Sequence, residues 1–333
     1  MGAVQEVKGP GSRLAKAVRG RLKTPPRCVF YGPEGVGKST LAAHAPTPIW
    51  FDIEDGSGKL DVTRYQFRDE PGGHVPRTYG EVTAALSDLT LSQHEYRSLV
   101  IDTADRLESL IWGHMVERDK TKVKGGVENI EDYGYGKGYQ IAVDEWRSLC
   151  ARLDVLRATR GMHIIILAHA HVKAFKNPEG DDYERYSLQV HDKAGGFLKG
   201  WADVVGFCRF DEGGSKLKGA TKAKGWSTGR RTLNLVRTAA FDAKGRGGMP
   251  AELELDAANP WAPLQKAMDD ADNLTAPQLA ALVAAEAARI GDVELTAKVD
   301  AACAVAVTKN DTETLNRYLQ DLKRRESKGA VTQ

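Results

Sequence analysis

The chain has 333 residues, of which 41% are hydrophobic and 28% are charged, and its formal net charge is +2. Its four cysteines form no C-x-x-C pair, which argues against a zinc ribbon or a disulfide framework. No apolar run is long enough for a signal peptide or a membrane span. We therefore expect a soluble, intracellular protein with reduced thiols.

The charge is unevenly distributed along the chain. Residues 1–27 carry seven Lys or Arg against one Glu, a net of +6, and residues 206–250 carry ten against three acids, a net of +7. Two basic segments in a nearly neutral chain favour a polyanionic partner such as nucleic acid. The alternative is a solvated basic tail and a solvated loop.

Short apolar runs alternate with helical patterns through the first two thirds of the chain. Helical spacing of Trp146, Leu149, Leu153 and Leu156 predicts a helix over about 140–160, and Gly161 would cap its C-terminus. This alternation predicts an α/β fold with a mostly parallel sheet covered by helices on both faces. The expected strands are 28–31, 49–53, 99–101, 164–168 and 204–208, with 233–236 as a further candidate.

Three regions are predicted. Residues 1–27 form a basic N-terminal segment with a short amphipathic helix that ends before Pro25-Pro26. Residues 28–265 form the α/β core. After a break around Pro260–Pro263, residues 275–326 form a small C-terminal helical region with two or three helices.

The most specific motif is a P-loop, G-x-x-x-x-G-K-[ST], between the first strand and a helix-compatible segment. Glycines allow such a loop to point its backbone N–H groups at phosphates. We expect Lys38 to reach the β- and γ-phosphates of ATP and the Ser39 hydroxyl to bind Mg²⁺. The nucleotide-binding residues predicted are Gly32, Pro33, Glu34, Gly35, Val36, Gly37, Lys38, Ser39 and Thr40.

Acidic residues end two of the expected strands. Asp102 follows a buried run and is predicted to hold Mg²⁺ together with Ser39. Thr103 follows Asp102, so enzymes with a catalytic Glu beside this Asp are disfavoured. Glu54, at the tip of another strand, is the predicted general base for the attacking water, with Asp52 and Asp55 as rivals.

A third strand ends in His169-Ala170-His171. His169 is predicted to lie where a γ-phosphate sensor sits in such folds, and we count it with Lys38, Glu54 and Asp102 as a catalytic candidate. A His-x-His pair also suits zinc, although the sequence offers no evident third ligand.

Together these features resemble the RecA-like branch of P-loop ATPases. The sequences of the P-loop and of the segment Phe51–Glu54 are similar to the corresponding sequences of RecA. The wider chain resembles phage-encoded, core-only RecA/Rad-like ATP-binding proteins. The resemblance spans about residues 26–260, and it implies an ATPase that acts in the cytoplasm of the bacterial host. The other segments that carry it are 101–103, 133–139, 167–173, 201–205 and 241–246.

In such proteins two loops hold single-stranded DNA, and they would fall here at about 119–139 and 172–195. Lysines that follow phosphates and rings that stack on bases suit this task, although a mobile loop with solvated lysines is the alternative. The basic stretch 213–231 is either a hairpin tip on DNA or a solvated insertion. The DNA-binding candidates are Lys124, Tyr133, Tyr135, Lys137, Tyr139, Lys173, Phe175, Lys176 and Arg185.

The resemblance also implies a homo-oligomer, ring or filament, in which a neighbouring subunit supplies a cation to each site. The candidates for that cation are Lys193, Lys199, Lys244 and Arg246. The expected function is ATP-dependent, DNA-stimulated annealing or recombination of single-stranded DNA, with a single-strand-binding protein as a candidate partner. The alternatives are a ring-forming helicase and a regulatory nucleotide-binding assembly protein.

Overall fold

The structure is a computed structural model, and it describes residues 24–122, 126–178, 180–215, 224–246, 248–273, 275–290 and 293–329. The predicted N-terminal helix and the tip of the basic stretch 213–231 lie outside these residues. The strands are β1 (Arg27–Gly32), β2 (Pro48–Asp52), β3 (Thr63–Arg64), β4 (Ser98–Asp102), β5 (His163–Phe175), β6 (Tyr183–Leu188), β7 (Val204–Ser215), β8 (Lys224–Asn234) and β9 (Glu252–Glu254).

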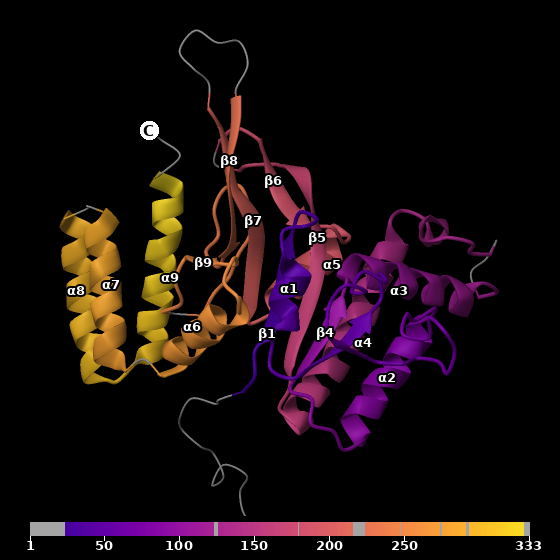
Figure 1. The fold of residues 1–333 in the computed structure, drawn as a ribbon. Coiled ribbons are helices and arrows are strands. Elements are labelled where there is room, and N and C mark those ends of the chain that lie inside the picture. Colours follow the sequence, from indigo (N-terminus) through magenta and orange to yellow (C-terminus); the bar gives the residue numbers. More distant parts are fainter. Residues whose placement is uncertain are drawn as a thin grey trace, which may run out of the picture.

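The helices cover the sheet and form the C-terminal part of the described chain (Figure 1). They are α1 (Lys38–Ala43), α2 (Tyr79–Leu91), α3 (Ala104–Asp119), α4 (Lys137–Arg160), α5 (Asp192–Trp201), α6 (Trp261–Asn273), α7 (Ala276–Ile290), α8 (Val293–Thr308) and α9 (Thr312–Gly329), with a 3₁₀ turn at Ile130–Tyr133.

The described strands form one sheet in the order β3-β2-β4-β5-β1-β7-β8-β9, and β6 pairs with β5 beside it. Pairing is parallel from β3 to β7 and antiparallel for β5–β6, β7–β8 and β8–β9. The prediction of a mostly parallel sheet is therefore confirmed. Since the carboxyl ends of parallel strands meet at one edge, the ends of β1, β2, β4 and β5 lie together there.

The alternating side chains of β1 show which helices cover each face of the sheet. Cys28 and Phe30 face a core that contains α1 and α6, whereas Val29 and Tyr31 face a second core that contains α2, α3, α4 and α5. Successive side chains of a strand point to opposite faces, so both faces of a buried strand must be apolar. This explains why β1 reads as a continuous apolar run.

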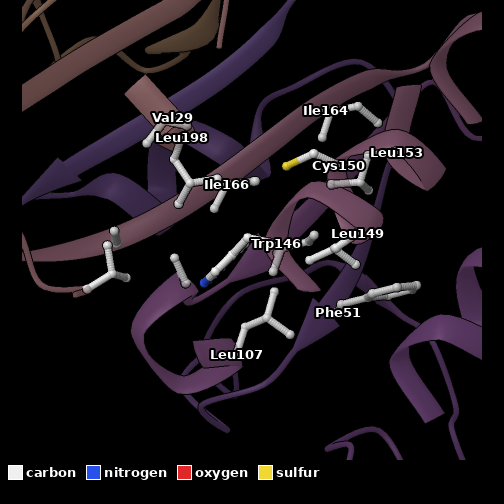
Figure 2. Close-up of a cluster of buried hydrophobic side chains, with 14 of the residues drawn as sticks. Val29, Phe51, Leu107, Trp146, Leu149, Cys150, Leu153, Ile164, Ile166 and Leu198 are labelled. Carbon is white, nitrogen blue, oxygen red and sulfur yellow. The ribbon is translucent and has the colours of Figure 1, made fainter. Parts of the chain in front are cut away.

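The predicted helix over 140–160 is confirmed, and it begins three residues earlier, at Lys137. Its apolar stripe packs Trp146, Leu149 and Leu153 onto the sheet (Figure 2). Gly161 caps the C-terminus at φ 65°, with its N–H donating to the Arg157 carbonyl, as the sequence predicts.

The basic stretch 213–231 contributes to both arms of the β7–β8 hairpin, which projects well beyond the sheet (Figure 1). The expected strand at 233–236 is thus misplaced, because β8 begins at Lys224 and ends at Asn234. A register shift between Phe210 and Glu212 interrupts the hairpin.

The C-terminal helices α7, α8 and α9 pack around a separate apolar cluster that includes Leu279, Val283, Leu315 and Leu319. Figure 1 shows them beyond the β9 side of the sheet. No helix among the described residues combines the length and the apolarity needed to cross a bilayer.

Candidate nucleotide-binding site

The P-loop connects β1 to α1 at the carboxyl edge of the sheet. Gly35 and Gly37 have φ values of 71° and 96°, which side chains with a Cβ rarely adopt. Gly32 is needed for another reason, because a Cβ there would lie 2.1 Å from the Cys208 carbonyl oxygen on β7. The glycines of the motif therefore fix both the shape of the loop and its closeness to the sheet.

Lys38 is buried at the start of α1, and its ammonium donates to the carbonyl oxygens of Gly32 and Pro33 at 2.9 and 2.8 Å. Burial lowers its pKa. These two carbonyls hold the charge of Lys38 inside the loop.

Ser39 and Asp102 meet as the sequence predicts, with the Ser39 hydroxyl donating to Asp102 Oδ2 at 2.9 Å. Asp102 ends β4 and is buried, and this burial raises its pKa to about 6 although the bond from Ser39 acts in the opposite direction. A hydroxyl beside a buried carboxylate is a fitting pair of hard oxygen ligands for Mg²⁺.

Glu54 follows β2 and lines the same pocket as Lys38. The Thr103 hydroxyl donates to Glu54 Oε2 at 3.0 Å, and the Glu54 N–H donates to the Asp102 carbonyl at 3.1 Å. The Thr that stands in place of a Glu after Asp102 therefore positions a Glu from the neighbouring strand.

The two other candidates for the general base, Asp52 and Asp55, have different partners. Asp52 is fully buried and accepts hydrogen bonds from the N–H groups of Gly56 and Ser57 and from the Ser57 hydroxyl, so it shapes the turn after β2. Asp55 pairs with His74 at 3.0 Å and is absent from the pocket lining.

His169 lies beside the P-loop, since it pairs with Gly32 in the register of β5 and β1. Its Nδ1 is 3.0 Å from Asp105 Oδ2, and its Nε2 is 3.9 Å from Glu54 Oε1. The hydrogen bond with Asp105 raises the pKa of His169, which favours an imidazolium that faces the pocket.

Asp105 is a site residue that the sequence analysis missed. Burial opposes its ionisation, but hydrogen bonds from the side chain and backbone of His169 outweigh burial and lower its pKa. Its place three residues after Asp102 was the available signal, because the first turn of α3 lies beside the strand tips. Among the described residues, Glu54, Asp105 and His169 bring their ligand atoms close enough together to hold a metal ion, whereas His171 belongs to no such cluster. The hypothesis that the His-x-His pair binds zinc therefore gains no support.

The P-loop, Glu54, Asp102, Thr103 and His169 line a cavity of about 280 Å³. The P-loop contributes Glu34, Gly35, Gly37, Lys38, Ser39 and Thr40. Val36 is fully buried in the core on the α1 face, so its role is to anchor the loop. Arg231 of β8 completes the wall and was not predicted, because it lies almost 200 residues from the motif in a stretch read as a basic hairpin.

Two tyrosines of the first segment predicted to bind DNA make contacts within the chain. The Tyr133 hydroxyl donates to the Met115 carbonyl at 2.9 Å, and Tyr139 stacks on His191 at 4.2 Å between ring centroids. These two rings anchor the turn, whereas Tyr135 and Lys137 are exposed. Lys124 lies outside the described residues.

The second segment predicted to bind DNA, residues 172–195, is not the loop that the sequence predicts, because most of it forms a hairpin and the start of a helix. The end of β5 pairs with β6 as a hairpin, and α5 begins at Asp192. Arg185 is only 5% exposed and pairs with Asp242 at 2.6 Å, so its predicted contact with DNA does not fit. Lys173 pairs with Asp192, Phe175 packs against Tyr183 and the Arg185 guanidinium, and Lys176 is exposed.

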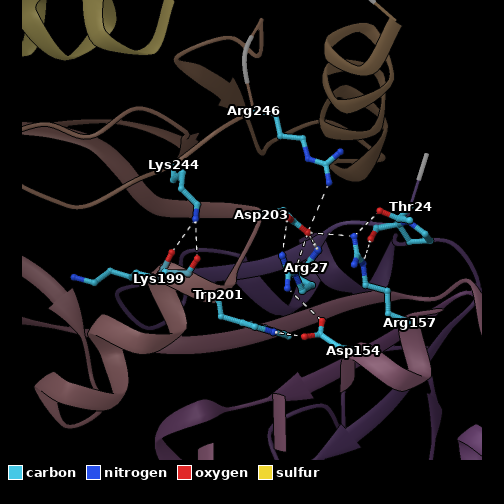
Figure 3. A network of polar contacts seen from close by, with 11 residues as sticks. Thr24, Arg27, Asp154, Arg157, Lys199, Trp201, Asp203, Lys244 and Arg246 are labelled. Atoms are coloured by element: carbon cyan, nitrogen blue, oxygen red, sulfur yellow. Dashed lines mark hydrogen bonds and ion pairs between the residues drawn. The ribbon is translucent and has the colours of Figure 1, made fainter. Parts of the chain in front are cut away.

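All four candidates for the trans-acting cation make polar contacts within the chain. Lys199 pairs with Asp242, Lys244 donates to the Lys199 and Gly200 carbonyls, and Arg246 lies 3.7 Å from Asp203. Figure 3 shows most of these residues around Arg27 and Asp203, which stand at the amino ends of β1 and β7, away from the P-loop. Lys193 is exposed and donates to Gln140 at 3.3 Å.

The comparison with known families agrees with this geometry. A family model described as "AAA domain" matches residues 24–247, which are two thirds of the chain and include every residue of the pocket. No curated protein matches the sequence. The chain therefore belongs to the AAA-domain family AAA_24, an AAA-type family of P-loop ATPases.

Proposed function

We propose that this protein hydrolyses ATP with Mg²⁺, with Glu54 as the general base. The observation that carries the proposal is the convergence of Glu54, the Ser39–Asp102 pair and His169 on one P-loop pocket. A carboxylate next to the γ-phosphate position can accept a proton from the attacking water. Thr103 supports this role because its hydroxyl fixes one Glu54 oxygen and leaves the other toward His169.

The remaining residues would act on the phosphate charge. Lys38 would exchange the Gly32 and Pro33 carbonyls for β- and γ-phosphate oxygens, and the His169 imidazolium would face the γ-phosphate. Mg²⁺ held by Ser39 and Asp102 would neutralise the charge that develops on the bridging phosphates.

We further propose that the ATPase is RecA-like and acts on single-stranded DNA as a homo-oligomer in annealing or recombination. Strand β5 supports a link between the two activities, since it carries His169 at the pocket and continues into the β5–β6 hairpin. That hairpin presents Val172, Lys176 and the Phe175–Tyr183 pair, a combination of cation and apolar surface suited to phosphates and bases. Contact with the nucleotide at His169 would thus affect the DNA-facing end of the same strand.

The test compares steady-state ATP hydrolysis by the wild-type chain and by Glu54→Gln, with and without single-stranded DNA. We expect DNA to stimulate the wild type, and Glu54→Gln to bind ATP but to hydrolyse it about 10²- to 10⁴-fold more slowly. Annealing of complementary fluorescent oligonucleotides would be measured in parallel.

Each part of the proposal can fail separately. Hydrolysis that is unaffected by Glu54→Gln would reject Glu54 as the base. A rate indifferent to DNA, together with no DNA binding at low salt, would reject the DNA partner. Directional unwinding of a forked duplex without annealing would point to a helicase instead.

A further inference from the structure

We infer that Arg231 is a cis-acting phosphate ligand that binds the α- and β-phosphates of the nucleotide from the β8 side of the pocket. The inference rests on the proposed nucleotide site and assigns it a cation that the P-loop motif does not contain. Arg231 lines the pocket, and a Cβ built on Gly37 would lie 3.5 Å from its Nη1 atom. The guanidinium of Arg231 thus lies in van der Waals reach of the loop at Gly37.

The position of Arg231 selects which phosphates it would meet. Glu54, Asp102 and His169 come from β2, β4 and β5, on one side of β1, whereas Arg231 comes from β8 on the other side. The first group surrounds the Mg²⁺ and γ-phosphate end of the site. Backbone groups of a P-loop next to its Lys hold the α- and β-phosphates, and Arg231 lies against this part of the loop.

Asp256 holds Arg231 in an orientation that leaves its terminal nitrogens for a ligand. One Asp256 oxygen accepts from Arg231 Nε at 2.6 Å and the other accepts from its backbone N–H at 2.6 Å. Among the described residues, no hydrogen-bond acceptor is found for Nη1 or Nη2. A guanidinium with both Nη groups available suits the paired oxygens of a phosphate.

The hydrogen bonds of Lys38 distinguish it from Arg231. Its ammonium is already satisfied by two P-loop carbonyls, whereas the Nη groups of Arg231 are not engaged in this way. Arg231 is therefore the cation of the pocket that is ready to receive a phosphate without first leaving another partner.

The test is isothermal titration of Arg231→Ala and Arg231→Lys with ADP and with a non-hydrolysable ATP analogue. We expect Arg231→Ala to weaken both ligands by a similar factor, about ten- to a hundredfold, as for loss of a charged hydrogen bond. Arg231→Lys, which keeps the charge but not the fork, should recover only part of this loss. Arg230→Ala is the matched control, because Arg230 is exposed, pairs with Glu254 and does not line the pocket.

Asp256→Ala tests the positioning role. It should weaken the binding of ADP less than Arg231→Ala does. In the Arg231→Ala background it should cause no further loss of affinity, because Asp256 acts through Arg231. A full additional loss in the double variant would overturn the role of Asp256.

Two results would overturn the role of Arg231 itself. One is ADP affinity of Arg231→Ala within twofold of the wild type, and the other is a loss confined to the ATP analogue. Both readouts use binding alone, so a wild type that binds ADP without hydrolysing ATP would reject the proposed hydrolysis and leave this test intact. A wild type that binds neither ligand would reject the nucleotide site as a whole.

Discussion

His169 and Asp105, which lie 64 residues apart in the sequence, are joined by two hydrogen bonds at the wall of the nucleotide pocket. The His169 N–H is 3.2 Å from Asp105 Oδ1, and the ring Nδ1 is 3.0 Å from Oδ2. The carboxylate thereby fixes the imidazole so that Nε2 points toward Glu54.

This pair should make stability depend on pH. Because pairing raises the pKa of His169, its stabilisation is complete below the unfolded value of about 6.5 and is lost as the pH rises through the raised pKa. The lowered pKa of Asp105 acts at the acidic end of the pH range, so the contribution of Asp105 to stability is lost as the pH falls through that pKa. We expect the Tm deficit of His169→Gln to be largest near pH 5.5–6.5 (roughly) and to shrink by pH 9. A deficit that does not change with pH would contradict the ion pair.

Glu54→Gln should separate binding from hydrolysis. Glutamine keeps the size and the acceptor oxygen that Thr103 contacts but cannot accept the proton of water. We expect unchanged ADP affinity with hydrolysis lower by about 10²- to 10⁴-fold. Asp55→Asn changes the neighbouring carboxylate, which faces His74, and should leave the rate within about twofold.

The metal site is tested by two substitutions at one position. Ser39→Ala removes the hydroxyl that contacts Asp102, so Mg²⁺-dependent hydrolysis should fall by about a hundredfold or more. Ser39→Thr keeps a hydroxyl that the motif allows and should retain most of the rate. Removal of divalent cations with EDTA should reduce the wild type to the level of Ser39→Ala, and hydrolysis that persists in EDTA would contradict the assignment.

Gly32→Ala should destabilise the fold. The new Cβ would meet the Cys208 carbonyl oxygen at 2.1 Å, and neither backbone can move without disturbing the pairing of β1 with β7. We expect a loss of about 1–3 kcal/mol in the free energy of unfolding, measured in urea. Gly113→Ala in α3 meets nothing within 4 Å and should instead stabilise by about 0.5–1 kcal/mol.

The DNA partner is tested on the β5–β6 hairpin. Lys176→Ala and Lys173→Ala together should weaken the binding of single-stranded DNA. The slope of log K against log salt should fall by about 1.4, because each of the two lost phosphate contacts accounts for about 0.7. Lys298→Ala removes an exposed lysine from α8 and should change neither quantity. An unchanged slope in the double variant would place the DNA elsewhere.

The sequence by itself determined the local parts of this site. The P-loop is a contiguous motif, so its glycines, Lys38 and Ser39 could be located without a fold. The tips of apolar strands identified Asp102, Glu54 and His169, because parallel strands bring their carboxyl ends to one edge. Helix α4 and its Gly161 cap were also predictable, since helical spacing and capping depend on neighbouring residues.

Only the tertiary structure decided how these parts meet and which charges stay available. Asp105 reaches His169 at the pocket through the packing of α3 against β5, and Arg231 reaches the pocket through the antiparallel return of β8. Lys199, Lys244 and Arg185 looked like free cations but are held by Asp242 or by carbonyls of α5. A charge is neutralised by whatever lies near it in space, so its availability follows from the fold and not from its place in the chain.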